Sequence, residues 1–401
     1  MTSAYVVGTG DTKFEELSYV KSVLQQAGVA VKLVDIGPLS KQSGADVTAG
    51  KVATFHPEGA DAVFRETDRG RALAAMTIAF EKFVDANRAD IAGMIGLGGS
   101  GNTALVTPGM RRLAIGVPKI MVSTVGSGNV APYVGPNDIA MMYSVVDIAG
   151  INSISRVVLG NAARFLAGAL KFGLPPASAR ELPNIGLTMF GVTTPCVNQV
   201  IERLKGDYEC FVFHATGVGG QTMEKLVDSG RFVGVVDVTT TEVADLLMGG
   251  VMSAGEDRLG AIARTRIPYV GSCGALDMVN FGGIETVPEK YRSRKLHVHN
   301  AQVTLMRTTP DENRQMGEWI GNKLNACEGP VRFLIPEKGV SIIDVEGMPF
   351  HDPVADQALF EALDRTVRQT ANRKLIRLPF AINDQAFSDA LAEQFVQVMG
   401  R

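Results

Sequence analysis

The chain has 401 residues but only 4 cysteines and little excess charge. The cysteines are scattered without Cys-x-x-Cys spacing, so the sequence indicates neither a zinc ribbon nor a disulfide framework. We therefore expect the protein to reside in the reducing cytoplasm. A formal net charge of −3, with no long basic run, gives no electrostatic footprint for nucleic acid. No apolar run reaches the roughly 20 residues of a membrane helix, and the first residues lack the pattern of a secretory signal. We therefore expect a cytoplasmic protein that binds neither nucleic acid nor membrane.

Two familiar nucleotide motifs are missing or incomplete. The P-loop pattern Gly-x-x-x-x-Gly-Lys-Ser/Thr is absent, and its nearest approach, residues 44–51, is one residue too long and is followed by Val52 instead of a hydroxyl. Residues 96–101 match the dinucleotide pattern Gly-x-Gly-x-x-Gly, but no acidic residue follows at the distance that binding of NAD requires. Asp35 could serve only the earlier turn at Gly8. The motifs alone therefore give weak evidence for a dinucleotide.

Three turns rich in glycine, serine and threonine each follow an apolar, β-like run in the first 130 residues. Glycine lets backbone N–H groups approach an anion, and a helix that begins after the turn adds its dipole. Plain strand-to-helix connections use similar residues, but three such turns favour a ligand site. The candidate cofactor-binding residues are Gly8, Thr9, Gly10, Asp11, Thr12 and Lys13 in the first turn, Gly98, Gly99, Ser100, Gly101, Asn102 and Thr103 in the second, and Ser123, Thr124, Gly126, Ser127 and Gly128 in the third.

The first turn also carries side chains that suit a metal-bound phosphate. Asp11 and Thr12 can orient the ligand shell of Mg²⁺, and Lys13 can face a phosphate. This chemistry favours a nucleoside triphosphate over NAD. Asp11 and Thr12 are also common residues at the start of a helix, and the two roles can coexist.

The hydrophobic pattern alternates between strand and helix, which predicts an α/β fold with mostly parallel sheets. In the first half the expected strands are 4–7, 29–36, 91–97, 119–125 and 143–148, and the expected helices are 15–26, 71–86, 103–115 and 153–172. Residues 37–70 lose this periodicity and are interpreted as a functional loop or a lid. In the second half the expected strands are 184–189, 210–214, 233–238, 268–271, 296–306, 331–335 and 375–379, with helices at 195–204, 311–326, 355–372 and 385–398.

The pattern breaks at residues 173–178, which contain two prolines and predict a domain boundary. We expect a Rossmann-like, doubly wound nucleotide-binding domain at 1–178 and a second Rossmann-like domain at 179–401 that holds a substrate. Two such domains in series predict a cleft between them.

Polar residues in the second half form a candidate substrate site. His214, Asp277 and His299 are the candidate acid–base catalysts, since His214 opens a glycine turn at a strand end and the other two lie at or on predicted strands. Hydrogen-bonded structural histidines are the competing interpretation, and whether the histidines bind a metal stays open. The candidate substrate-binding residues are Gly217, Gly219, Gly220, Thr240, Glu242 and Asn300.

Several short strings, in the same order along the chain, resemble one known family. They are GTGDTK at residues 8–13, GGSGNT at 98–103, PYVG at 132–135, VDIAGIN at 146–152, FHATG at 213–217, GALDMVNF at 274–281 and HN at 299–300. The chain resembles, over nearly its whole length, a bacterial uncharacterised protein family whose plant relatives form the N-terminal ATP-binding domain of a tobamovirus resistance protein, an inhibitor of viral RNA replication.

The resemblance implies two Rossmann-like subdomains, ATP with Mg²⁺ in the first, and homodimers. The positions that match the family's nucleotide turns are residues 8–13 and 98–103. At the third turn many relatives carry Ala-Ser-Gly-Asp, whereas this chain has Gly-Ser-Gly-Asn at residues 126–129, so a metal role there loses its carboxylate. The antiviral activity belongs to the plant protein's contacts with a viral partner and is not expected of this chain.

Three functions remain open from the sequence. The first is an ATP-binding cytoplasmic protein, which as an enzyme would use the triphosphate on a small carboxylate metabolite. The second is a lyase or hydrolase of a small keto or hydroxy acid, with chemistry in the second domain and the nucleotide as regulator. The third is a nucleotide-gated binding protein without catalysis, whose partner contacts residues 37–70.

Overall fold

The computed structural model describes residues 2–39, 44–173 and 182–400. The chain divides into a first unit, Met1–Ala177, and a second unit, Ser178–Arg401. The predicted boundary at residues 178 and 179 lies outside the described residues. Among the helices of the described residues, none combines the length and apolar character that crossing a bilayer requires. The two units are described separately below.

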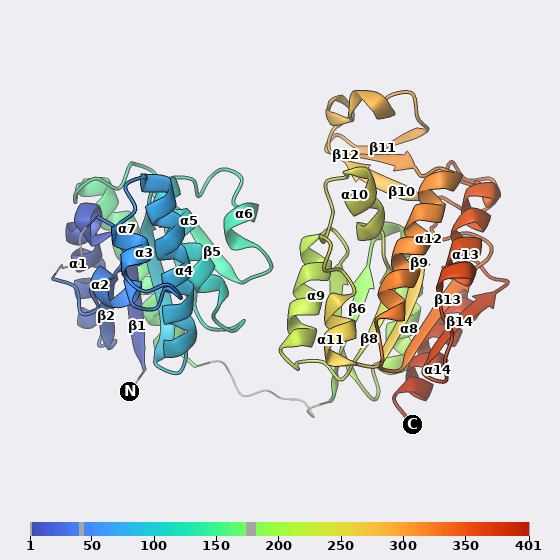
Figure 1. The fold of residues 1–401 in the computed structure, drawn as a ribbon, viewed down its shortest axis with the longest axis horizontal. Helices are drawn as coiled ribbons and strands as arrows, with labels where there is room; N and C mark the ends of the chain where they lie inside the picture. Colours follow the sequence, from blue (N-terminus) through green and yellow to red (C-terminus); the bar gives the residue numbers. More distant parts are fainter. Residues whose placement is uncertain (1, 40–43, 174–181, 401) are drawn as a thin grey trace. The chain divides into compact units, whose positions relative to one another are not determined.

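The first unit is a parallel sheet with helices on both faces (Figure 1). Its strands are β1 (Ser3–Gly8), β2 (Val31–Asp35), β3 (Ile91–Gly98), β4 (Lys119–Ser123) and β5 (Ile139–Tyr143). Its helices are α1 (Gly10–Gln26), α2 (Ala49–Ala53), α3 (Asp61–Phe64), α4 (Arg69–Asn87), α5 (Ser100–Arg111), α6 (Ala131–Val134) and α7 (Ser153–Lys171). The strand order is β2-β1-β3-β4-β5.

Alternating side chains of β1 show how this sheet is covered. Ala4 and Val6 pack with apolar residues of α1 and α7, whereas Tyr5 and Val7 pack with those of α4 and α5. Successive strand residues point to opposite faces, so both faces of a central parallel strand must be apolar. The run at residues 4–7 therefore marks the centre of the first core.

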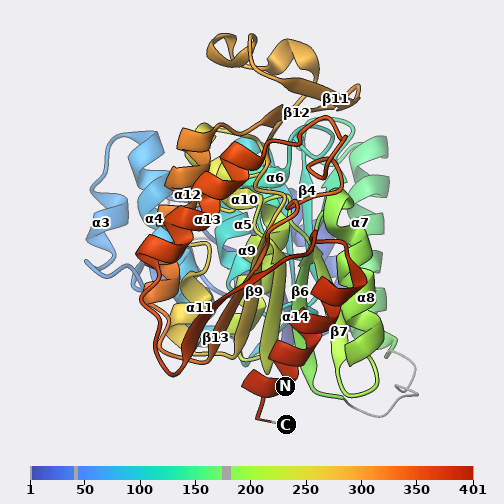
Figure 2. The same cartoon turned by 90° about the vertical axis from the view of Figure 1, so that its right-hand side faces the viewer.

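The second unit has a larger parallel sheet in the order β14-β13-β9-β8-β6-β7. Its strands are β6 (Asn184–Met189), β7 (Glu209–His214), β8 (Gly234–Thr239), β9 (Tyr269–Gly274), β13 (Val331–Pro336) and β14 (Arg373–Leu378). Its main helices are α8 (Thr194–Leu204), α9 (Val218–Asp228), α10 (Glu242–Met248), α11 (Gly260–Thr265), α12 (Pro310–Asn325), α13 (Pro353–Thr366) and α14 (Gln385–Val398). Helices α12 and α13 lie side by side on one face of this sheet (Figure 2). Both parallel sheets confirm the predicted α/β class.

Two sequence predictions were wrong about strands. The expected strand at 296–306 is two antiparallel strands, β11 (Leu296–Asn300) and β12 (Val303–Arg307), which form a small separate sheet with β10 (Met278–Phe281). The turn between them is made without glycine or proline: the backbone N–H of Gln302 donates to Asn300 Oδ1 at 2.8 Å. The expected strand at 143–148 is instead β5 followed by a turn, because Val145 has a left-handed φ of 68°.

Asp245 of α10 is hydrogen-bonded to Asn280 of β10, and its burial predicts how the stability of the protein depends on pH. It is fully buried; its Oδ2 accepts a hydrogen bond from Asn280 Nδ2 at 2.6 Å and its Oδ1 accepts one from the Asn280 backbone N–H at 3.0 Å. Burial raises the pKa of Asp245 to about 7. The folded state holds this proton more tightly, so the contribution of Asp245 to stability is full below about pH 4 and is lost as the pH rises through about 7.

We expect Asp245→Asn, which resembles the protonated acid, to flatten this part of the stability profile. The free energy of unfolding, measured in urea between about pH 5 and pH 8, should fall less steeply with rising pH in the variant than in the wild type. Equal slopes for the two proteins would contradict the assignment.

Candidate functional site

The carboxyl ends of β1 and β3 enclose a cavity of about 300 Å³, which we call the switch-point cavity. β1 pairs with β2 on one side and with β3 on the other, so the chain order reverses there. Ligands of open α/β sheets commonly bind at such a reversal. The cavity is lined by Thr9, Asp11, Thr12, Lys13, Pro38, Leu39, Arg69, Leu73, Gly99, Ser100, Gly101, Asn102 and Asp147. The first and second predicted turns therefore meet at one site.

The first turn leads from β1 into α1, and the protein supplies a carboxylate of its own there. Asp35, at the end of β2, accepts hydrogen bonds through Oδ1 from the N–H groups of Gly10, at 2.6 Å, and Gly37, at 2.8 Å. A Cβ added at Gly10 would lie 2.7 Å from Asp35 Oδ2, so glycine is needed for this approach. Asp35 is fully buried and therefore stabilises the start of α1 instead of facing a ribose.

The second turn leads from β3 into α5, and no side chain caps this helix. The first N–H groups of a helix have no acceptor within the helix, so those of Ser100, Gly101 and Asn102 are available to a ligand. Gly98 has a φ of 149°, and a Cβ there would lie 2.4 Å from Asn102 Cβ. Asn102 Nδ2 donates to Thr9 Oγ1 at 3.0 Å, which ties the second turn to the first.

Charged side chains of both signs line the cavity together with the uncapped N-terminus of α5. The pKa of Asp11 is raised above its ordinary value, chiefly by burial and then by the charge on Asp35. Thr12 Oγ1 lies 2.8 Å from Thr9 Oγ1. The Lys13 ammonium group donates to the carbonyl of Ile148 and also lines the cavity. The site thus offers an ammonium group, helix N–H groups and a carboxylate within one cavity.

The third turn supports the second turn but does not line the cavity. Thr103 Oγ1 lies 2.6 Å from Ser123 Oγ, and the Thr124 N–H donates to the Gly98 carbonyl at 3.3 Å. A Cβ at Gly126 would lie 2.9 Å from the backbone of Tyr143, whereas Ser127 and Gly128 are exposed. Thr103 also donates to the Gly99 carbonyl at 2.9 Å and is fully buried. These contacts give Ser123 and Thr124 a structural part in shaping the site.

The sequence analysis missed five lining residues: Pro38 and Leu39 after β2, Arg69 and Leu73 on α4, and Asp147 after β5. Asp147 lies in the string VDIAGIN, so its position in the family pattern was the available signal. Pro38, Leu39 and Arg69 lie in residues 37–70, which were interpreted as a functional loop or a lid without naming side chains, and Leu73 lies in the expected helix at 71–86.

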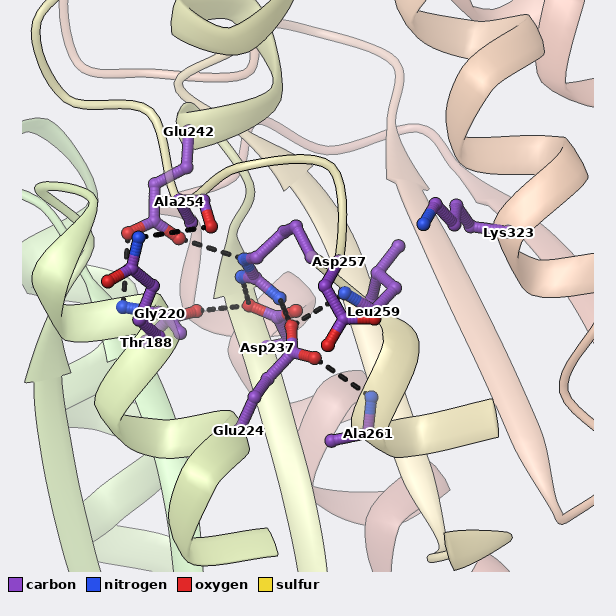
Figure 3. A network of polar contacts seen from close by, with 12 residues as sticks. Thr188, Gly220, Glu224, Asp237, Glu242, Ala254, Asp257, Leu259, Ala261 and Lys323 are labelled. Atoms are coloured by element: carbon purple, nitrogen blue, oxygen red, sulfur yellow. Dashed lines mark hydrogen bonds and ion pairs between the residues drawn. The ribbon is translucent and has the colours of Figure 1, made fainter. Parts of the chain in front are cut away.

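In the second unit, the backbone N–H groups predicted for a substrate hold a side chain of the protein itself. Glu242 Oε1 accepts a hydrogen bond from Gly217 N at 2.7 Å. It also accepts one from Gly220 N at 3.0 Å (Figure 3). A Cβ at Gly219 would meet the His214 carbonyl, and Thr240 Oγ1 donates to the Ser272 carbonyl at 3.0 Å. The N–H groups of Gly217 and Gly220, two of the candidate substrate-binding residues, are thus already paired with Glu242.

Glu242 belongs to a buried ionic network centred on Arg258. The guanidinium group contacts Glu224 at 3.2 Å, Asp237 at 2.7 Å and Glu242 at 2.8 Å, and the three acids come from α9, β8 and α10 (Figure 3). Burial raises the pKa values of Glu224 and Glu242. Both acids are still held by hydrogen bonds from backbone N–H groups, so the network joins three elements at the carboxyl-end edge of the sheet.

The three candidate catalysts are not joined by any hydrogen bond in the described residues. His214 is exposed at the end of β7, and its ring lies against Phe190, 5.3 Å between centroids. Asp277 is fully buried and accepts from Ser341 Oγ at 2.8 Å, and burial raises its pKa to about 6. His299 and Asn300 are exposed on β11. The structure therefore shows no acid–base constellation made of these residues.

Magnesium fits the switch-point cavity only together with a ligand. In the described part of the chain, no group of three or more histidine, cysteine, aspartate or glutamate side chains is placed to hold a metal ion. Mg²⁺ commonly keeps water ligands and uses one or two carboxylates plus the phosphates of a nucleotide. Asp11 and Asp147 supply carboxylates of that kind.

Comparison with known proteins agrees with the family resemblance. Residues 2–174 match the N-terminal domain, and residues 182–399 the C-terminal domain, of an uncharacterised protein family, UPF0261. Members from Mesorhizobium japonicum and Clostridium tetani are 56% and 44% identical, each over 98% of both chains. The ToMV resistance protein Tm-1 of Solanum lycopersicum is 43% identical over 98% of this chain and 55% of its own length. The chain therefore belongs to the UPF0261 family, with the family's N-terminal and C-terminal domains in its first and second units.

Proposed function

We propose that the first unit binds a nucleoside triphosphate, with ATP and Mg²⁺ as the ligand, in the switch-point cavity. The observation that carries this proposal is the meeting of the α1 and α5 turns at one cavity, with the uncapped start of α5 opposite Asp11 and Lys13. Helix N–H groups and an ammonium group suit phosphates, and the carboxylate suits their metal ion. Pro38, Leu39 and Leu73 give the cavity an apolar wall for a base.

The proposal places this protein in the cytoplasm as a homodimer, in keeping with the family resemblance. The four thiols of the described residues are all free, which suits a reducing compartment. An enzymatic use of ATP on a small carboxylate would need a second site. The geometry favours neither that step nor the lyase or hydrolase alternative, since Gly217 and Gly220 already bind Glu242.

Isothermal titration of the folded chain with ATP, with and without magnesium, tests the proposal. We expect binding that magnesium strengthens. A folded sample that gives no heat at millimolar ATP would remove the proposed function.

Asp11→Ala separates a ligand role from a helix-start role. We expect the affinity for magnesium-bound ATP to fall about tenfold, a loss typical of one charge contact at a partly exposed site. The melting temperature should hardly change, because removal of Asp11 also removes its repulsion with Asp35. Glu15→Ala, on the exposed side of α1, is the matched control and should change neither quantity. A melting temperature lowered by several degrees with unchanged ATP affinity would show that Asp11 serves the helix alone.

A further inference from the structure

The segment between β5 and α7 brings an unassigned carboxylate, Asp147, to the switch-point cavity. The next residue, Ile148, is buried, and its carbonyl accepts the hydrogen bond from Lys13. Two residues farther, the Gly150 N–H donates to Glu16 Oε1 at 2.8 Å. The segment is thus fastened to α1 at two points directly after Asp147.

Val145, two residues before Asp147, has a backbone conformation that valine rarely adopts. Its φ of 68° lies in the left-handed region, which is unfavourable for a β-branched residue. Val145 is 54% exposed, so packing does not enforce the conformation. Hydrogen bonds do: the Val146 N–H donates to the Ser144 carbonyl at 2.8 Å, and the Ser144 hydroxyl donates to the Val146 carbonyl at 2.7 Å. Strain of this kind persists where the surrounding structure imposes one geometry.

The hydrogen bond that the described residues show for the Asp147 carboxylate comes from the adjacent backbone. Oδ1 accepts from the Ile148 N–H at 2.8 Å. No ion pair in the described residues includes Asp147, although the ammonium group of Lys13 bonds to the adjacent carbonyl. A carboxylate in this position repels a bare polyphosphate, and it attracts one that carries a divalent cation.

We propose that Asp147, positioned by the strained turn at Val145, makes the switch-point cavity select the magnesium-bound triphosphate over the metal-free one. This inference rests on the proposed nucleotide function. Asp147 differs from Asp11 in origin: it follows β5, the edge strand opposite β2, and its segment is bonded to α1 close to the turn that carries Asp11.

The experiment measures the dissociation constant of ATP with magnesium and with a chelator, and the readout is the ratio of the value with chelator to the value with magnesium. We expect Asp147→Asn to lower the ratio about tenfold, because metal-free ATP binds better while magnesium-bound ATP binds less well. Glu15→Gln, an exposed acid on α1 outside the cavity, is the matched control and should keep the wild-type ratio.

Two variants at Val145 test the positioning. Val145→Gly keeps the turn, since glycine adopts a positive φ without steric cost, and should keep the wild-type ratio. Val145→Pro imposes a φ near −65° and should move the ratio toward that of Asp147→Asn. Thermal unfolding verifies that each variant is folded, and Asp147→Asn decides the question if Val145→Pro does not fold.

The two possible failures are distinct. A wild type that binds ATP under neither condition overturns the proposed function and this inference with it. A wild type whose binding depends on magnesium, together with an Asp147→Asn variant of unchanged ratio, overturns the inference alone.

Discussion

Arg258→Met should destabilise the second unit by about 3–5 kcal/mol, because it leaves the carboxylates of Glu224, Asp237 and Glu242 buried without their shared cation. Methionine fills much of the same volume, so the loss reports charge and not a cavity. Tryptophan fluorescence in urea measures it in the full chain, since the single tryptophan, Trp319, lies in α12 of the second unit. The loss should shrink at lower pH, where the acids take up protons.

The matched control for this variant is Arg264→Met. Arg264 pairs with Asp228 at 2.8 Å and with Asp257 at 2.7 Å, but its side chain is 47% exposed. Exposed ion pairs contribute about 0–1 kcal/mol, so this variant should unfold nearly as the wild type does. Similar losses in both variants would show that the buried network around Arg258 has no special part in the stability of the unit.

Gly101→Glu should abolish most ATP binding while leaving the fold as stable as before, or more so. A Cβ at Gly101 meets no atom within 4 Å, so a larger residue fits there. Replacing a helical glycine gains about 0.5–1 kcal/mol, and an acid in the first turn of α5 interacts favourably with the helix dipole. The same carboxylate lies where we place the phosphates, and apposed like charges cost several kcal/mol, or about a 100-fold loss of affinity.

Gly101→Gln is the matched control, because it has nearly the same size without the charge. Its affinity for magnesium-bound ATP, measured by titration calorimetry, should fall much less than that of Gly101→Glu. If the two variants bind ATP equally well, the phosphates do not lie at the start of α5, and the proposed placement of the ligand is wrong.

Local patterns predicted most of the fold and part of the site. The turns at Gly8 and Gly98 follow short apolar runs and precede amphipathic helices, and this strand–turn–helix order is written in adjacent residues. Parallel pairing then follows from the connections. The strand predicted at residues 143–148 was wrong because valine and isoleucine favour strands, yet Val145 lies in a turn. The observed strand, β5, is instead formed by Ile139–Tyr143, a segment rich in methionine.

The partners of charged groups could not be predicted, because they are set by tertiary contacts. Glu242 accepts a hydrogen bond from the Gly217 N–H, 25 residues away, and no local pattern indicates that a side chain of the protein occupies this turn. Asp277 lies at a strand end, where a catalyst is expected, but it is buried against Ser341, 64 residues away. Asp147 was missed for the same reason: it reaches the cavity from the strand farthest from β2.

The carboxylate of Asp35 affects which small anions the cavity can bind. Inorganic phosphate, sulfate and chloride compete for any exposed helix end in a cell. Because the Gly10 N–H already donates to Asp35, the start of α1 attracts a lone anion less than the uncapped start of α5 does. Under the proposed function, a longer, metal-bearing ligand would contact the start of α5 together with Lys13, Asp11 and the apolar wall. The Asp35 carboxylate thus makes the cavity more selective against single small anions.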